Sequence, residues 1–218
     1  MARTLSTYAL ASLDEMKRAC GVDVLTVQAE GNNFLDNLFD SLEFASDEIE
    51  RFLERHLVTR GALTEYHTAD KAQRSELFLG QFPVISITSV TEGYWSAGAF
   101  VTGTTLIAGT DYINDAATGR LIRLSGADQY SWQSGFERVK VVYAAGYANT
   151  AAVPDKIARV CLALAARRFH EVNSQSAGVQ SKTDGLGTVT RFLPAELLRM
   201  EQDALAGERR HYTTGRAA

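Results

Sequence analysis

The stretch 139–169 joins a strand to a helix, and it constrains the fold more than any other part of the sequence. Apolar side chains occupy every second position at its start, at Val139, Val141 and Tyr143. This is the period of a strand with one buried face. Gly146 then permits a turn, and Pro154 suits a first helical turn, where its missing N–H is not needed. The sequence therefore predicts a strand that ends near Ala144 and a helix that begins near Pro154.

Two apolar stripes run along this predicted helix. One contains Ile157, Val160, Cys161 and Leu164, and the other contains Ala158, Leu162, Ala165 and Phe169. A helix that is apolar around most of its circumference needs neighbours on two sides, and its alanines permit a close approach. We expect it to be the most deeply buried helix of the chain.

Two helices are predicted ahead of the strands. The first is short, because Ser12 and Glu15 form a capping-box pattern at its start and Gly21 ends it. The second is long and is capped by Thr26 or Asn32. Its apolar seam follows spacings of three and four residues, at Leu35, Leu38, Leu42, Ala45, Ile49, Phe52 and His56.

The outer face of the second helix is acidic. It carries Asp36, Asp40, Glu43 and Asp47, and no lysine or arginine lies between residues 30 and 50. Acids early and bases late in a helix suit its dipole, so one interpretation is a solvated face. The other interpretation is a surface turned toward a passing polyanion or a basic neighbour.

The region 61–146 changes to the period of strands. Pro83 marks a sheet edge or the start of a strand. The segment TDYINDAATGRLIRL predicts a hairpin, in which Asn114 and Asp115 open the turn and Gly119 supplies a positive φ.

Two segments of this region carry aromatic residues among polar ones. The segment Tyr94–Thr105 surrounds Trp95 and Phe100 with Gly, Ala, Ser and Thr, which predicts a hairpin tip or a projecting loop. Trp132 lies in a second polar segment. Exposed aromatic residues often anchor a partner, whereas a tryptophan often folds back over the core, and both readings stay open.

The C-terminal part begins with a polar, glycine-rich stretch at 173–190, which we expect to be a flexible loop or a segment ordered by a neighbour. Pro194 is expected to open a last helix, with Leu197, Met200 and Ala204 on one side, and Gly207 ends it. The tail that follows is basic and has one aromatic residue. A frayed terminus is the ordinary fate of such a tail.

Composition limits the classes of function. A net charge of −4 argues against a general nucleic-acid binder, which needs a surplus of cations to neutralise phosphates. Cys20 and Cys161 lie far apart, so neither a zinc site nor a disulfide framework is predicted. We found no catalytic motif, no metal-ligand spacing among the four histidines and no apolar run that approaches a membrane span. We therefore expect a soluble, unexported protein that is not an enzyme, with no catalytic residues, metal or cofactor.

Several segments, taken in order, resemble one family. They are ASDEIE at 45–50, FPVISITSVTE from Phe82, YINDAATGRLIRL, VKVVYAAGY and VPDKIARVCLALAARRF. In this series the chain resembles the head–tail connector proteins of tailed phages, the adaptors that lie beneath the portal. The similarity extends to the related adaptors of gene transfer agents. The segments Tyr94–Thr105 and Ala127–Gly135 look like elaborations that leave the subfamily open.

The resemblance implies a mainly helical α+β fold. A core of about four helices would hold an antiparallel β module inserted between the second and third helices, and a C-terminal arm would extend from it. The expected divisions are 1–60 for the N-terminal helices, 61–147 for the β module, 148–206 for the C-terminal helices, and 207–218 for the tail.

The resemblance also implies a role. Copies of the chain would form a ring, usually of twelve, that docks on the portal, extends the DNA channel and attaches tail or stopper proteins. Such a protein would lie at the head–tail junction of the virion, and in the host cytoplasm during assembly. DNA would be only passing cargo, and no membrane is involved.

Three groups of residues are candidates for this role. Channel-lining candidates are Asp36, Asp40, Glu43 and Asp47, because a wall of like charge would let DNA slide. Portal-binding candidates are Arg209, Arg210, His211 and Tyr212, and candidates for tail or neighbour contact are Trp95 and Phe100. Two alternatives remain: a DNA-binding module of the packaging machinery, and a hydrolase with its site at the joint of sheet and helix.

Overall fold

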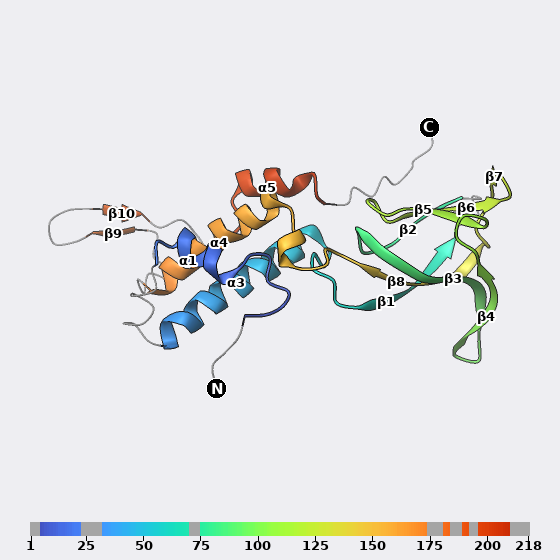
Figure 1. Ribbon diagram of the computed structural model, residues 1–218, viewed down its shortest axis with the longest axis horizontal. Helices are drawn as coiled ribbons and strands as arrows, with labels where there is room; N and C mark the ends of the chain where they lie inside the picture. Colours follow the sequence, from blue (N-terminus) through green and yellow to red (C-terminus); the bar gives the residue numbers. More distant parts are fainter. Residues whose placement is uncertain are drawn as a thin grey trace. The chain divides into compact units, whose positions relative to one another are not determined.

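The computed structural model divides the chain into two units (Figure 1). The helical unit comprises Met1–Glu54 and Asn149–Ala218, and the β unit comprises Arg55–Ala148. The structure describes residues 5–22, 32–69, 75–173, 181–183, 189–191 and 196–209. The β unit is therefore an insertion between the two halves of the helical unit.

The described part of the helical unit holds four α-helices: α1 (Leu13–Ala19), α3 (Asn32–Leu53), α4 (Asp155–Asn173) and α5 (Arg199–Ala206). The predicted capping box of α1 is confirmed: the Ser12 hydroxyl accepts a hydrogen bond from the Glu15 N–H at 3.3 Å, and the Glu15 carboxylate accepts one from the Ser12 N–H at 2.8 Å. A short 3₁₀ turn, η1 (Thr150–Ala152), leads to α4, which begins directly after Pro154 as predicted.

Helix α4 forms the centre of this unit and packs against α1, α3 and α5. Its buried residues are Ile157, Val160, Cys161, Leu164, Ala165 and Phe169. The buried hydroxyl of Ser46 joins three segments, since it donates to the Leu42 carbonyl at 2.8 Å, accepts from the Leu10 N–H at 3.1 Å and lies 3.6 Å from the Cys161 sulfur. The predicted apolar helix with neighbours on more than one side is confirmed.

The seam of α3 is confirmed only in its middle. Leu38, Leu42, Ala45 and Ile49 are completely buried. His56 does not extend the seam, because α3 ends at Leu53, Glu54 adopts a positive φ of 57° and His56 is exposed beyond it. The spacing of apolar residues extended the predicted helix past Glu54, where the backbone turns.

The apolar side predicted for the last helix is only partly buried. Met200 is 71% exposed, whereas Glu201 and Leu205 are buried. The reason is polar: the Glu201 carboxylate accepts from the Leu198 N–H at 2.9 Å and pairs with Arg167 of α4 at 2.7 Å, which turns its side of the helix inward. Pro194 lies outside the described residues, and the helix begins at Arg199.

The described part of the β unit contains eight strands in two antiparallel sheets: β1 (Ala62–Ala69), β2 (Glu76–Phe78), β3 (Val84–Ser96), β4 (Ala99–Leu106), β5 (Tyr112–Asp115), β6 (Arg120–Ser125), β7 (Asp128–Gln129) and β8 (Gly135–Ala145). One sheet has the order β1-β8-β3-β4, and the other has the order β2-β6-β5 with β7 paired to β6. Side chains from both sheets form one core. Val139, Val141 and Tyr143 of β8 are completely buried in it, as the alternation predicted.

Two loop predictions for this unit are resolved. The hairpin of β5 and β6 is confirmed, with Gly119 at a φ of 66° and the Asp115 carboxylate accepting from the Ala117 N–H at 3.2 Å and the Thr118 hydroxyl at 2.7 Å. Trp132 is 3% exposed and belongs to the core. It folds back over the sheets, so the reading of Trp132 as a partner anchor is wrong.

The prediction of a mainly helical fold with a four-helix core is also wrong. Of the residues that the structure describes, 34% lie in helices and 35% in strands. Strands make up much of the β unit, whereas α1 and α5 are only 7 and 8 residues long. The segment 94–105, predicted to be a hairpin tip or a projecting loop, is a hairpin tip, in which β3 and β4 continue to a turn at Ala97 and Gly98. An exposed ladder of Thr and Gly shows no apolar alternation, so its period is not visible in the sequence.

The stretch 173–190 was predicted to be a flexible loop. Two short strands, β9 (Ser181–Thr183) and β10 (Val189–Arg191), form an antiparallel ribbon within and just beyond it. The remainder of that prediction lies outside the described residues.

Candidate assembly surfaces

The tip of the β3–β4 hairpin forms an extension that we call the finger (residues 93–102). β3 pairs with β8 only as far as Glu92, and beyond that point it pairs with β4 alone. A register shift between Glu92 and Gly93 marks the root of the finger. Such a β-bulge bends the strand and increases its twist. The finger therefore leaves the plane of its own sheet.

Three aromatic rings gather on the finger and the neighbouring strand β1. The Tyr66 ring lies 5.3 Å from both the Trp95 and Phe100 rings, and the latter two lie 6.1 Å apart, edge to face. The Lys140 ammonium lies 5.9 Å from the Tyr66 ring and 6.0 Å from the Phe100 ring. We call Tyr66, Trp95, Phe100 and Lys140 the aromatic patch. Trp95 is 39% exposed, so the patch offers an amphipathic surface.

Gly93 leaves space for the Phe100 ring of this patch. A Cβ atom at Gly93 would come within 2.6 Å of the Phe100 ring. Only a residue without a side chain lets that ring lie flat on the strand. The structure brings together the two predicted residues, Trp95 and Phe100, and adds Tyr66 and Lys140, which sequence reasoning missed because register across strands is not visible in the chain.

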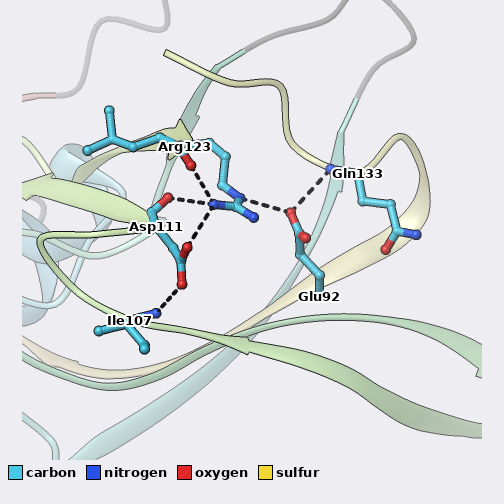
Figure 2. Close-up of polar contacts among 6 residues, drawn as sticks. Glu92, Ile107, Asp111, Arg123 and Gln133 are labelled. Atoms are coloured by element: carbon cyan, nitrogen blue, oxygen red, sulfur yellow. Dashed lines mark hydrogen bonds and ion pairs between the residues drawn. The ribbon is translucent and has the colours of Figure 1, made fainter. Parts of the chain in front are cut away.

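An arginine cluster fixes the root of the finger (Figure 2). The Arg123 guanidinium donates from Nε to the Glu92 carboxylate at 3.3 Å and from Nη1 to the Asp111 carbonyl at 2.7 Å, and Nη1 lies 3.8 Å from the Asp111 carboxylate. The Asp111 carboxylate also accepts from the Ile107 N–H at 2.8 Å. Arg123 belongs to one sheet and Glu92 to the other, so the cluster ties the two sheets together where the finger begins. Sequence reasoning missed it.

The four acidic candidates on α3 follow spacings of four, three and four residues, which places them on one stripe of the helix. We call Asp36, Asp40, Glu43 and Asp47 the acidic stripe. Asp40 and Asp47 are exposed, whereas Asp36 and Glu43 are partly buried. The Glu43 carboxylate accepts a hydrogen bond from the Ser6 N–H at 3.1 Å. Glu43 thus has a structural role in addition to its place on the stripe.

The basic tail is described only at its start. Arg209 forms an ion pair with Glu54, and its guanidinium lies 5.6 Å from the Phe52 ring. These contacts hold the end of α5 to the end of α3. Arg210, His211 and Tyr212 lie outside the described residues.

A second set of titratable groups in the β unit, Glu65, His67 and Tyr143, serves packing. Buried Tyr143 donates its hydroxyl hydrogen to the Glu65 carboxylate, which also accepts from the Gly80 N–H at 2.9 Å and lies 3.0 Å from His67 Nε2. Burial raises the pKa of Glu65, but hydrogen bonds from His67, Gly80 and Tyr143 outweigh burial and hold that pKa below its ordinary value. The carboxylate is thus a fixed acceptor between β1, β8 and the segment after β2.

Other groups give little sign of a reactive site. Burial raises the pKa of the Cys161 thiol to about 12 and that of Cys20 to about 11, so neither forms a ready thiolate nucleophile at neutral pH. Within the described residues, no group of three or more His, Cys, Asp or Glu side chains could hold a metal ion. No helix in the described ranges is both long and apolar enough to span a membrane.

Solved structures provide the most informative comparison. A chain in the neck of an empty gene transfer agent particle, computed with C6 symmetry, matches with a TM-score of 0.56 over 98% of this chain and 95% of that chain. The chain shares its fold with a component of that neck. Sequence identity is 19%, so the likeness is one of fold.

Two further structures agree. A chain of the native gene transfer agent virion matches with a TM-score of 0.55 and 21% identity, over 98% of this chain and 95% of that one. A chain in the native neck, computed with C12 symmetry, matches with a TM-score of 0.50 and 19% identity, over 98% of each chain. No family model and no curated protein matches the sequence. The findings agree with the resemblance to head–tail connectors of phages and gene transfer agents.

Proposed function

We propose that this chain is a structural protein of a virion neck, a head–tail adaptor whose copies form a ring beneath the portal. The observation that carries the proposal is the shared fold over 98% of the chain with neck components of gene transfer agent particles. Those necks were computed with C6 and C12 symmetry, which supports a cyclic assembly and favours a ring of twelve. The particle would be a phage or a gene transfer agent, and assembly would take place in the host cytoplasm.

The ring would extend the DNA channel, and the acidic stripe is our candidate for its wall. The stripe has two exposed carboxylates, and residues 32–50 of α3 include no lysine or arginine. A wall of the same sign as DNA avoids the phosphate contacts that would hold a moving duplex. DNA is thus a passing cargo, which is compatible with the net charge of −4.

The remaining candidates divide between the partners. The tail residues Arg209, Arg210, His211 and Tyr212 are proposed to contact the portal, since arginine and tyrosine are good interface anchors. The ion pair of Arg209 with Glu54 would then have to open or be shared. Trp95 and Phe100 are proposed to contact a tail protein or a neighbouring copy.

A genetic experiment tests the role. Deleting the gene from a producing strain should leave DNA-filled heads and free tails that fail to join, and expression in trans should restore joined particles. Electron microscopy of lysates would count the three forms. Joined particles at the wild-type frequency in the deletion strain would contradict the proposed function.

A further inference from the structure

In the part of the chain that the structure describes, the outer edge of β4 has no strand beyond it. β4 is the last strand of the order β1-β8-β3-β4, and it forms its ladder with β3. Within the described residues, no backbone hydrogen bond joins residues 99–105 to any segment except β3. The side chains of residues 101–105 are exposed. A row of N–H and C=O groups is therefore open to pairing.

This edge also lacks the usual protection. Natural proteins guard edge strands with charged side chains, with proline or with bulges. Residues 93–110 contain no charged residue and no proline. The other edge strands of the two sheets each carry a carboxylate, namely Glu65 in β1, Glu76 in β2 and Asp115 in β5. The bulge of this hairpin lies at the root of the finger and leaves a regular ladder from Ala99 to Thr102.

We propose that the β4 edge is a contact between neighbouring copies of this chain, in which an extended segment of the next copy adds to β4 by backbone hydrogen bonds. Strand addition uses the main chain for affinity, so it suits an edge whose side chains are small and polar. The exposed Trp95 beside that edge would be covered by the same neighbour.

The choice of a second copy rests on the proposed ring. In a cyclic assembly each copy presents one face to the next copy and a different face to the previous one. An open edge is then capped in every copy, whereas the same edge on a free protein would be a template for aggregation. The necks that share this fold were computed with C6 and C12 symmetry, so a rotational neighbour is the occupant that the comparisons support.

Hydrogen–deuterium exchange of the full chain tests the contact. The samples are the free chain and the chain assembled on its portal, without tail proteins. We expect the amides of peptides covering 99–105 to exchange at least about tenfold more slowly in the ring than in the free chain. Exchange in the ring at the free-chain rate would overturn the inference.

A pair of variants separates strand addition from simple burial. Ladder hydrogen bonds alternate along an antiparallel pair, and a two-residue turn joins a bonded pair, here Ser96 and Ala99. The N–H of Thr102 is therefore expected to point to the open edge. Thr102→Pro removes that donor, and Thr102→Val keeps it. We expect Thr102→Pro to weaken ring assembly about fivefold or more, and Thr102→Val to assemble as the wild type does.

The outcomes distinguish this inference from the proposed function. A wild-type ring on the portal with no protection of 99–105 would overturn the inference and leave the adaptor role intact. Protection that arises only after tail proteins are added would also overturn it, because the occupant would be a tail strand. A chain that forms no ring on the portal would contradict both. If Thr102→Pro fails to fold, as circular dichroism would show, the exchange measurement on the wild type decides.

Discussion

Gly146 lies where the segments at the two ends of the β unit run side by side, bridged at Val58 and Tyr147. The Tyr147 N–H donates to the Leu57 carbonyl at 2.6 Å, and the Gly146 N–H donates to the Pro83 carbonyl at 2.8 Å. Gly146 has a φ of 100°, and a Cβ there would come within 2.8 Å of the Leu57 carbonyl oxygen. Position 146 therefore needs glycine both for its backbone conformation and for space.

Two alanine substitutions separate these requirements. Gly126 has a φ of 65° with open space around it, so Gly126→Ala should cost about 1 kcal/mol of the free energy of unfolding, from backbone conformation alone. Gly146→Ala adds the clash and should cost roughly 3 kcal/mol. Urea unfolding of both variants measures the difference. Equal losses of unfolding free energy would show that the surroundings of Gly146 are less crowded than the structure indicates.

The environment of Glu65 predicts that the β unit loses stability at acid pH. Its folded-state pKa lies below the ordinary value, so its stabilising contribution is complete above about pH 4.3 and is lost as the pH falls through the lower folded pKa. Glu65→Gln should therefore destabilise the protein more at pH 7 than at pH 3, as thermal unfolding would show. Glu76→Gln, at a more exposed ion pair with Arg120, is the control for removing a strand carboxylate. A Glu65→Gln penalty that is independent of pH would contradict the assignment.

At the scale of elements, the arginine cluster should matter more than an ordinary ion pair. The side chains of Arg123 and Glu92 are 11% and 15% exposed, whereas those of Arg120 and Glu76 are 38% and 40% exposed. Arg123→Met leaves the poorly solvated Glu92 carboxylate with the Gln133 N–H but no cation, and should cost about 2–3 kcal/mol. Arg120→Met should cost less than about 1 kcal/mol. Urea unfolding gives both values, and similar losses would remove the special role of the cluster.

The acidic stripe belongs to the element α3, and its proposed role concerns DNA rather than folding. Asp40→Lys with Asp47→Lys should leave the ring intact but slow DNA ejection or impair its retention, because cations in the wall would hold phosphates. The matched control is Asp128→Lys with Asp203→Lys, which makes the same charge change at exposed sites on β7 and α5. Infectivity or transfer frequency measures the effect. Equal values for the two double variants would count against a channel wall.

Predictability from the sequence differed among the elements for physical reasons. Elements with a strong local signal were found, such as the Ser12 cap, the turn at Gly119 and the alternation of Val139, Val141 and Tyr143. The hairpin tip at 94–105 was also predicted, but the length of its strands was not, because an exposed Thr-rich ladder has no apolar period. The clusters of candidate residues could not be predicted from the sequence.

Those clusters depend on strand register. Tyr66 meets Phe100, and Arg123 meets Glu92, only because the order β1-β8-β3-β4 and the packing of the second sheet bring them together. Likewise, the inward turn of α5 depends on a partner, Arg167, on another helix. The spacing of residues within one element does not reveal such contacts between elements.

At the scale of the whole molecule, the two units carry different surfaces. The helical unit bears the acidic stripe and the start of the basic tail, and the β unit bears the finger with its aromatic patch and open edge. This division is compatible with the proposed adaptor, which would meet DNA, a portal, a tail and its own copies. The titratable groups described in detail are committed to packing, capping or ion pairs.

The measurement that tests this account most directly is electron microscopy of the purified chain mixed with its portal, with each protein alone as a control. We predict an added ring of density on one end of the portal, and twelvefold symmetry in its averages. A portal that gains no density, while the chain alone remains a folded monomer, would contradict the adaptor role.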